Sequence, residues 1–272
     1  MIGKSGILLA ATGDKYVDEA IPLIASIRQF MPDVLIHFVT DEATTIADGL
    51  VDSVDRLDVD LSDYPQQFRG YLFRVLSLQR SPFERTVHMD CDTILGTSIY
   101  EMFHALQRFE LLVGAAPMKL LTYGNSSEML PEDCDKPSVP VVPRINVGVI
   151  GYNRSCMESG FFAHWCKLFK HGMAPATKKG RTKFGDQSVF RKAIWETNVN
   201  FLLLPPEFHL RTGAPQYLHG KVRIAHGRPP VGREKLIAFV NSYTEQRLYL
   251  PYQSMMIKRS NNWVNVKLTD FQ

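Results

Sequence analysis

Two aspartates separated by one residue, Asp90 and Asp92, are the side chains of this sequence best suited to chemistry. They directly follow the stretch 85–89, whose composition predicts a β-strand. In an extended segment, side chains two residues apart point the same way, so both carboxylates can face one small volume beyond the strand end. Mg²⁺ and Mn²⁺ prefer such oxygen ligands and commonly bind phosphate oxygens as well. The pair therefore predicts a divalent cation that binds a nucleotide diphosphate and acts on it as a Lewis acid.

One of these aspartates could instead cap the helix that comes next. That helix, however, has a start signal of its own, because Ser98 and Glu101 have the spacing of a capping box ahead of an apolar run. The motif Asp90-Cys91-Asp92, placed directly after a strand, therefore favours a functional site over a helix cap.

The rest of the sequence predicts the sheet that would position this motif. The expected strands are 7–11, 34–39, 53–59, 85–89, 144–152 and 201–204, and the expected helices are 14–31, 67–79, 161–169 and 187–195. The first strand, helix and strand form a β-α-β unit, which requires a parallel sheet, and Asp14 can cap its helix. Because ligands bind at the carboxyl edge of such a sheet, the acid pair is expected at that edge. An irregular loop rich in Pro, Ser, Asn and Asp is expected near 122–143.

The overall composition is that of an ordinary globular protein. The chain has 272 residues, of which 45% are hydrophobic and 22% charged, so we expect one large α/β domain. The net charge of +3 is small and the basic residues are scattered, which argues against a nucleic-acid partner. The four cysteines form no Cys-x-x-Cys pair, which favours a reducing, cytoplasmic location. No apolar stretch approaches the ~20 residues of a membrane-spanning helix, so any contact with a membrane should be peripheral.

Five short motifs resemble one enzyme family in their order along the chain. They are Tyr71-Leu72-Phe73-Arg74, Asp90-Cys91-Asp92, Asn146-Val147-Gly148-Val149, Gly185-Asp186-Gln187-Ser188 and Ala225-His226-Gly227. The order is similar to that of glycosyltransferase family 8, the glycogenin and galactosyltransferase group. The resemblance implies the Rossmann-like GT-A fold, with a central, mostly parallel sheet flanked by helices. The resemblance covers about residues 6–230, and we expect a GT-A domain over 1–239 with the C-terminal extension 240–272 packed on or beside it.

The resemblance also implies a substrate and a metal. The donor would be a UDP-sugar and the cofactor Mn²⁺ or Mg²⁺, with a hexose transferred to the hydroxyl of a glycan, protein or lipid acceptor and anomeric configuration retained. His226 would join Asp90 and Asp92 as the third metal ligand; the alternative for this histidine is an ordinary surface position. The family usually has a glycine three residues after this histidine and then Lys-Pro-Trp. Here Gly227 follows directly, and Arg228 would replace the lysine that neutralises the diphosphate.

Four further residues would bind the donor by the same resemblance. Thr12, Gly13 and Tyr16 would lie against the uridine, with Tyr16 stacking on the base. Alternatively, Tyr16 is an aromatic residue of a helix surface. Arg74 would reach the donor sugar and its phosphate, since it lies at the edge of the apolar stripe of its helix; a solvated arginine is the alternative.

Three residues would lie near the reacting carbon. Asn146 would bond a sugar, with Gly148 keeping the backbone close, although a turn asparagine is the alternative. Asp186 would bond sugar hydroxyls and could also cap the helix it precedes. Gln187 would lie near the reacting face. Because glutamine is a poor nucleophile, a front-face displacement through an oxocarbenium-like state is favoured over a covalent intermediate.

Two other functions fit parts of the sequence. A sugar-phosphate nucleotidyltransferase also begins with an apolar strand and uses metal-binding acids, but the loop 12–15 lacks the extra glycine and the arginine typical of those enzymes. A catalytically silent module would bind nucleotide sugars without turning them over. The segment 240–272, which mixes aromatic and basic residues, could add a helix or a strand pair, or offer an interface to an acceptor or a membrane.

Overall fold

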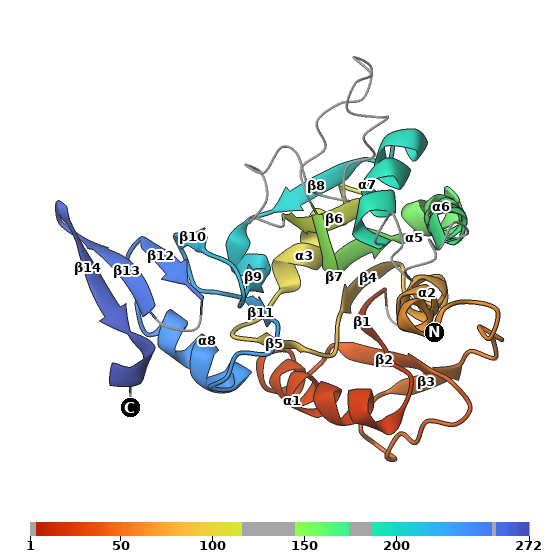
Figure 1. Ribbon diagram of the computed structural model, residues 1–272, viewed down its shortest axis with the longest axis horizontal. Helices are drawn as coiled ribbons and strands as arrows, with labels where there is room; N and C mark the ends of the chain where they lie inside the picture. The colour runs from red at the N-terminus through yellow and green to blue at the C-terminus, as the bar shows by residue number, and fades with distance from the viewer. Residues whose placement is uncertain (1–3, 116–144, 174–185, 252–253, 272) are drawn as a thin grey trace.

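The computed structural model describes residues 4–115, 145–173, 186–251 and 254–271 (Figure 1). Its first elements are β1 (Ser5–Ala10), α1 (Asp14–Phe30), β2 (Leu35–Thr40), β3 (Ser53–Arg56), α2 (Gln66–Leu78), β4 (Arg85–Met89), β5 (Thr93–Leu95), α3 (Tyr100–Ala105) and β6 (Leu111–Ala115). The later elements are β7 (Ile145–Asn153), α5 (Arg154–Glu158), α6 (Phe161–Met173), α7 (Asp186–Thr197), β8 (Phe201–Leu204), β9 (Leu210–Arg211), β10 (Gln216–Leu218), β11 (Ile224–His226), α8 (Arg233–Asn241), β12 (Arg247–Leu250), β13 (Ser254–Arg259) and β14 (Asn262–Lys267).

The central sheet has seven strands in the order β3-β2-β1-β4-β7-β6-β8. Neighbouring strands are parallel, except that β7 runs antiparallel to both β4 and β6. The prediction of a mostly parallel sheet with an N-terminal β-α-β unit is therefore confirmed. Of the seven strands of this sheet, β6 is the one that the sequence analysis did not predict.

Helices cover both faces of this sheet, as the alternation of buried side chains along β1 requires. Ile7 and Leu9 belong to a core cluster that includes residues of α1 and α3. Leu8, between them, belongs to the cluster with α2, α6 and α7 on the other face. Both faces of β1 are therefore buried, which explains why its sequence is a continuous apolar run instead of an alternating one.

The motif with Asp90 and Asp92 lies where the strand order changes direction. From β1 the chain adds β2 and then β3 on one side, whereas β4 pairs with the other side of β1. Such a switch point leaves a crevice outside the carboxyl ends of the strands, where ligands bind in open α/β sheets. Because β4 ends at Met89, the two aspartates follow at that edge, as predicted.

A second, three-stranded sheet carries a distant part of the chain to the same place. Its order is β5-β11-β9, and β11 runs antiparallel to β5. In that pairing His226 lies opposite Thr93, the residue directly after Asp92. Backbone pairing therefore sets the histidine beside the acid pair, although 133 residues of sequence separate it from its strand partner (226 − 93).

The C-terminal segment 240–272 forms the end of α8 and three strands, where the sequence analysis considered a helix, a strand pair or an interface. The strands β12, β13 and β14 form a four-stranded antiparallel sheet together with β10, at the opposite end of the molecule from α2 and α6 (Figure 1). A third core cluster joins this sheet to α8 and includes Tyr249, Met255 and Ile257. The predicted boundary between 239 and 240 falls inside α8, and the division into a domain and an extension stays a prediction.

Two predicted helix caps are wrong. The residue that precedes α1 is Gly13, with φ of +84°, and the carboxylate of Asp14 accepts from the amide of Thr45 at 3.1 Å. The cap position of α3 is Ile99, without a side-chain hydrogen bond, so Ser98 and Glu101 form no capping box. Glu101 pairs with Arg223 at 2.7 Å instead, because a distant cation offers its carboxylate a stronger partner than the local backbone.

One predicted loop and one of the four cysteines cannot be compared with the structure. The loop predicted at 122–143 lies outside the described residues, as does Cys134. The other cysteines, Cys91, Cys156 and Cys166, are buried free thiols. Across the described ranges, every helix is too short or too polar to cross a membrane.

Candidate functional site

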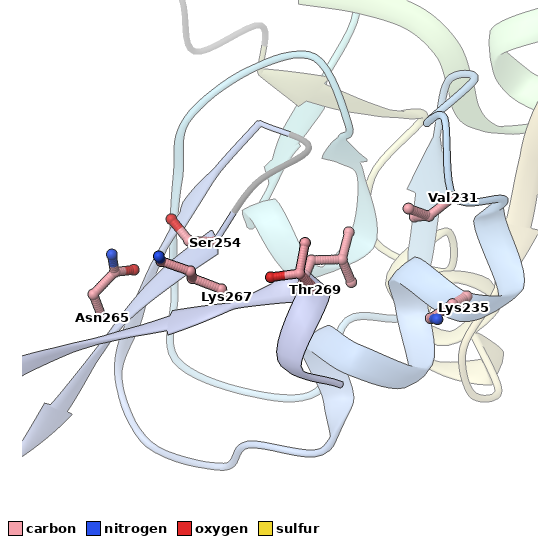
Figure 2. A pocket seen from close by; sticks show the side chains of 7 residues that line it. Val231, Lys235, Ser254, Asn265, Lys267 and Thr269 are labelled. Atoms are coloured by element: carbon pink, nitrogen blue, oxygen red, sulfur yellow. The ribbon is translucent and has the colours of Figure 1, made fainter. Parts of the chain in front are cut away.

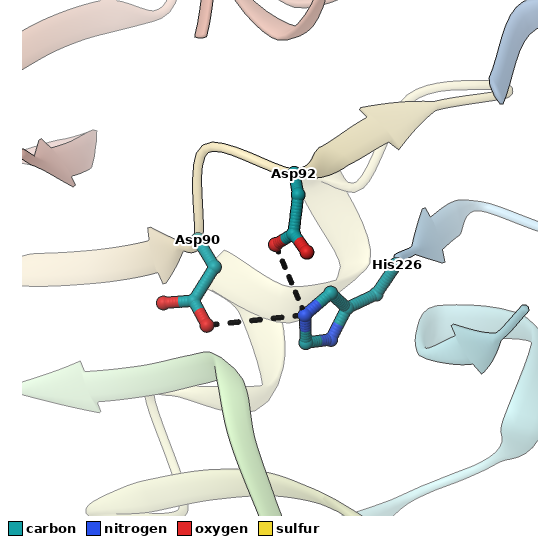
Figure 3. A group of neighbouring side chains, drawn as sticks. All are labelled: Asp90, Asp92 and His226. Atoms are coloured by element: carbon teal, nitrogen blue, oxygen red, sulfur yellow. Dashed lines mark ion pairs between the residues drawn. The ribbon is translucent and has the colours of Figure 1, made fainter. Parts of the chain in front are cut away.

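Asp90 and Asp92 lie in a tight turn after β4, whereas the sequence suggested an extended segment. The amide and the hydroxyl of Thr93 both donate to the carbonyl oxygen of Asp90, at 3.0 and 2.8 Å. The amide of Asp90 donates to the carbonyl oxygen of Gly148 on β7, at 2.8 Å. These bonds fix the turn against the sheet, and the two carboxylates still face the same volume (Figure 3).

His226 completes a group of three side chains that could hold a metal ion. Its Nε2 lies 3.2 Å from Oδ1 of Asp92 and 3.8 Å from Oδ2 of Asp90 (Figure 3). The three residues each offer a ligand atom within 4.8 Å of the others. Around an ion with ligands at about 2.1 Å, two ligands at right angles are separated by about 3.0 Å and opposite ligands by about 4.2 Å. Both distances to the histidine lie between these values, so this donor set fits Mg²⁺ or Mn²⁺.

Two glycines let the histidine approach the turn. A Cβ atom at Gly148 would collide with Cε1 of His226, so a residue without a side chain is needed where the ring crosses β7. Gly227 has φ of +124°, a conformation that side chains disfavour, and its amide donates to the carbonyl oxygen of Asp92 at 2.9 Å. The backbone just after β11 is thus hydrogen-bonded to the turn that contains Asp90 and Asp92.

Arg74 and His88 hold Asp90 in its charged form. Nη1 of Arg74 bonds both carboxylate oxygens at 2.9 Å, and the arginine side chain is only 11% exposed. Nε2 of His88 lies 3.4 Å from Oδ1 of Asp90. Burial by itself raises the pKa of Asp90, but the charge of Arg74 and the hydrogen bond with His88 outweigh it and hold that pKa well below its ordinary value. The carboxylate is therefore ionised at neutral pH, as metal binding requires.

Asp92 is stabilised as an anion by a different pair of partners. Burial and the nearby Asp90 oppose its ionisation, yet His226 and Arg228 lower the pKa of Asp92 overall. Nη1 of Arg228 lies 2.9 Å from Oδ2 of Asp92, while the rest of the guanidinium bonds Glu19 on α1 at 2.6 and 2.7 Å. The hydrogen bond with Glu19 in turn raises the pKa of Arg228. Arg228, whose side chain is 63% exposed, thus presents positive charge beside the acid pair.

The sequence analysis missed a histidine behind His226. Nε2 of His209 lies 2.8 Å from Nδ1 of His226, and the planes of the two rings differ by only 8°. The ring of His209 is buried, and desolvation, with a further contribution from His226, lowers its pKa well below the ordinary value. No motif marks His209, because it reaches the site only through the pairing of β9 with β11.

Glu19 and Arg233 are two further residues that the sequence analysis did not single out. Nη1 of Arg233 donates to the carbonyl oxygen of Cys91 at 3.0 Å, and its Nη2 donates to that of Glu19 at 3.0 Å. The thiol of Cys91 points away from the acids, toward the carbonyl oxygen of Ala10 at 3.8 Å, and burial raises its pKa. The spacing of Glu19 from Tyr16 puts both on one face of α1, which is a signal that sequence reasoning could have used.

The three residues expected at the uridine lie at the start of α1, next to the carboxyl end of β1. The amide of Gly13 donates to Oγ1 of Thr44 at 2.6 Å, which ties this turn to the loop after β2. Thr12 is half-buried, whereas the ring of Tyr16 is 45% exposed. An aromatic face is therefore open beside the sheet edge, and its role in base stacking stays a prediction.

The residues expected at the reacting carbon lie on β7 and α7. The buried Oδ1 of Asn146 accepts from the amide of Gly148 at 3.0 Å, close to the turn that holds Asp90. Asp186 is the first residue of α7, but its side chain lies outside the described part, and the side chain of Gln187 is half-buried. Contact of these three residues with a sugar stays a prediction.

The strand order and the acid pair at the switch point define a nucleotide-diphospho-sugar transferase fold, the GT-A fold. No known protein-family profile and no protein of curated function matches the sequence. Mouse xyloside xylosyltransferase 1 in its apo form matches 84% of this chain over 98% of its own, at 15% identity and a TM-score of 0.56. The galactosyltransferase LgtC with donor and acceptor sugar analogues matches 88% of this chain over 96% of its own, at 13% identity and a TM-score of 0.57.

An active-site variant of LgtC gives the same coverages and TM-score at 14% identity. The chain therefore has the fold of these glycosyltransferases, as predicted. At such identities the likeness is one of fold, and one fold can support several chemistries. The activity has to be argued from the site.

A separate hollow of about 600 Å³ lies between α8 and the strands β13 and β14 (Figure 2). Lys235, Lys267 and Ser254 are among the residues that line it. It has no acidic lining residue, so it offers no alternative site for a divalent cation.

Proposed function

We propose that this protein is a metal-dependent glycosyltransferase, which transfers a hexose from a UDP-sugar to the hydroxyl of a glycan, protein or lipid acceptor. The observation that carries the proposal is the convergence of Asp90, Asp92 and His226 at the switch point of a GT-A sheet. Two carboxylates match the oxygen preference of Mn²⁺ and of Mg²⁺, which also bind diphosphate oxygens, and the imidazole is a ligand more typical of a transition metal such as Mn²⁺ than of Mg²⁺. When bound, such an ion supplies Lewis acidity that stabilises the charge developing on the departing diphosphate.

Two arginines next to the acids would add fixed positive charge for the same diphosphate. Arg228 is the more accessible of the two, and its ion pair with Glu19 keeps the guanidinium at the rim of the site. Arg74 bonds both carboxylate oxygens of Asp90, so its main role is to keep that carboxylate charged and oriented. Preorganised charge of this kind acts in the transition state without costly rearrangement.

The donor would lie along the carboxyl edge of the sheet. Its uridine would contact Thr12 and Gly13 and stack on the exposed ring of Tyr16. The sugar would then extend toward Asn146 and the start of α7, where Asp186 and Gln187 would bond its hydroxyls. This direction agrees with the order of the elements in the sheet, in which β1, β4 and β7 are successive neighbours.

The ion pairs of the carboxylates in the site support retention of anomeric configuration. The carboxylates of Asp90 and Asp92 are held by cations, and that of Glu19 is held by Arg228. Within the described part of the site, no carboxylate is thus left for a covalent intermediate. A front-face attack by the acceptor hydroxyl, through an oxocarbenium-like state, fits this arrangement.

The test is release of UDP from a panel of UDP-sugars, measured with and without added Mn²⁺ or Mg²⁺. Wild-type protein should release UDP only with metal, and Asp92→Asn should lower the rate at least about 100-fold, the scale of losing one electrostatic group of the transition state. Asp55→Asn, which removes an aspartate of a distant ion pair with Arg80, is the matched control. Full activity of Asp92→Asn would contradict the metal role.

The same assay separates the two other functions. Pyrophosphate as the product, from a sugar phosphate and a nucleoside triphosphate, would identify a nucleotidyltransferase. Tight binding of UDP without any turnover would identify a silent nucleotide-sugar-binding module. Bound ligand raises the apparent stability by mass action, so a thermal shift detects binding in either case. The cytoplasmic location expected from the sequence stays a prediction.

A further inference from the structure

His209 lies directly behind the proposed metal ligand His226. Its Nε2 is 2.8 Å from Nδ1 of His226, and the two rings are within 8° of parallel, with centroids 5.1 Å apart. At that centroid separation the rings lie nearly edge to edge, so the contact is an in-plane hydrogen bond. The side chain of His209 is only 1% exposed, which excludes solvent from this bond.

We infer that His209 is a positioning residue, which holds His226 with the lone pair of Nε2 directed at the cation. This inference rests on the proposed metal site. A metal-binding imidazole must have an unprotonated Nε2, so the single proton of the neutral ring belongs on Nδ1. There it would donate to Nε2 of His209, 2.8 Å away, which accepts when the proton of His209 is on its own Nδ1.

Without this acceptor, His226 has a competing arrangement. Oδ1 of Asp92 lies 3.2 Å from Nε2 of His226, close enough to accept a hydrogen bond from that nitrogen. A proton on Nε2 would occupy the lone pair that the cation needs. With its own proton on Nδ1, His209 stabilises the tautomer of His226 that binds metal against the tautomer that bonds Asp92. Metal-bound histidines generally have such a partner on the second nitrogen.

Glycines in the neighbouring strands leave room for the two histidine rings. A Cβ at Gly114 on β6 would collide with Nδ1 of His209, and a Cβ at Gly148 on β7 would collide with His226. Two glycines on adjacent strands thus leave room for two rings in one line. Nδ1 of His209 has no hydrogen-bond partner in the part of the chain that the structure describes, so the bond to His226 is the polar contact that this ring makes there.

The experiment is a calorimetric titration of the full chain with Mn²⁺ alone, which measures the affinity for the ion. His209→Leu removes the acceptor while keeping bulk, and we expect it to weaken Mn²⁺ binding about 10- to 100-fold, the usual loss for such a partner. His209→Gln keeps an acceptor near the position of Nε2 and should bind within about 3-fold of wild type. His37→Leu, at another buried histidine that contacts Ser53 on β3, is the matched control and should leave Mn²⁺ binding unchanged.

A second readout separates positioning from a purely structural role. Without metal, nitrogen-15 NMR of the histidines should give Nδ1-protonated His226 in the wild-type protein and in His209→Gln, and Nε2-protonated His226 in His209→Leu. If His209→Leu does not fold, His209→Asn replaces it, because the asparagine amide is too short to reach His226. Equal Mn²⁺ affinity of wild type and His209→Leu, or of His209→Gln and His209→Asn, would overturn the inference while leaving the metal site intact. A wild-type chain that binds no Mn²⁺ would overturn both.

Discussion

Glu19 and Arg228, which are 209 residues apart in the sequence, form a two-pronged ion pair at 2.6 and 2.7 Å. The pair joins α1 to the segment after β11 and leaves Nη1 of the same guanidinium on Asp92 at 2.9 Å. One arginine therefore connects the helix that would receive the nucleotide with the acids that would hold the metal. The fixed fork of a guanidinium makes such a double contact directional.

Glu19→Gln should lower the affinity for the donor but change the free energy of unfolding only slightly. The ion pair is partly exposed, so its loss should cost less than about 1 kcal/mol of unfolding free energy. Arg228 would no longer be held toward the diphosphate, and we expect KM for the UDP-sugar to rise about 3- to 10-fold, in line with a coupling of about 1 kcal/mol. Steady-state kinetics and chemical unfolding measure the two effects. A KM equal to that of wild type would contradict a role for Glu19.

Gly148→Ala should disrupt the proposed metal centre. The added methyl group would collide with the ring of His226, which has to move away from the aspartates. We expect Mn²⁺ affinity to fall at least about 10-fold, with a loss of about 1 to 3 kcal/mol of stability typical of overpacking.

Gly151→Ala on the same strand is the control for Gly148→Ala. Its new methyl group would meet the flexible side chain of Leu112 at 2.8 Å, and no part of the site. It should therefore lose stability without losing Mn²⁺ affinity. Calorimetry with Mn²⁺ compares the two variants, and an equal affinity in both would mean that the position of the His226 ring does not matter.

Tyr16→Ala should weaken UDP binding if the exposed ring stacks on the base. Stacking of a base on an aromatic side chain contributes about 1 to 3 kcal/mol, so Kd for UDP should rise about 5-fold or more. Tyr16→Phe keeps the ring and should bind like wild type. Tyr100→Ala, at another tyrosine exposed to a similar degree, controls for loss of a surface aromatic residue. Equal affinities of Tyr16→Ala and Tyr100→Ala would place the base elsewhere.

The ionised state of Asp90 should make the metal-free protein sensitive to acid. Its folded pKa is depressed below the unfolded value of about 3.9, so the unfolded state takes up the proton first as the pH falls. The stabilisation is therefore fully present above about pH 4 and is lost as the pH falls through the folded pKa. Asp90→Asn should be less stable near neutral pH, because the ion pair between Arg74 and Asp90 is lost, and should lose less stability between about pH 4 and pH 2.5.

Chemical unfolding at a series of pH values measures this difference. Asp33→Asn, at an exposed aspartate, controls for removal of one surface charge. Parallel curves of unfolding free energy against pH for wild type and Asp90→Asn would show that Asp90 is not held in its charged form.

The local features of the chain could be predicted because their causes are local. The apolar run at β1 and the helical spacing along α1 come from neighbouring residues, and so does the placement of Asp90 and Asp92 after β4. The two cap predictions failed for the same physical reason in both places. Asp14 and Glu101 found partners from other elements, Thr45 and Arg223, and no local pattern contains those partners.

The sequence by itself determined which side chains are available: a pair of carboxylates behind a buried strand, and a mostly parallel sheet that would put them at its edge. Only the tertiary structure decided which side chains surround them. The antiparallel pairing of β11 with β5 brought His226 to the turn, and His209 and Glu19 came with other elements. Such contacts depend on strand register and on the packing of distant segments, which are set by burial and backbone bonding over the whole fold and not by any short stretch of residues.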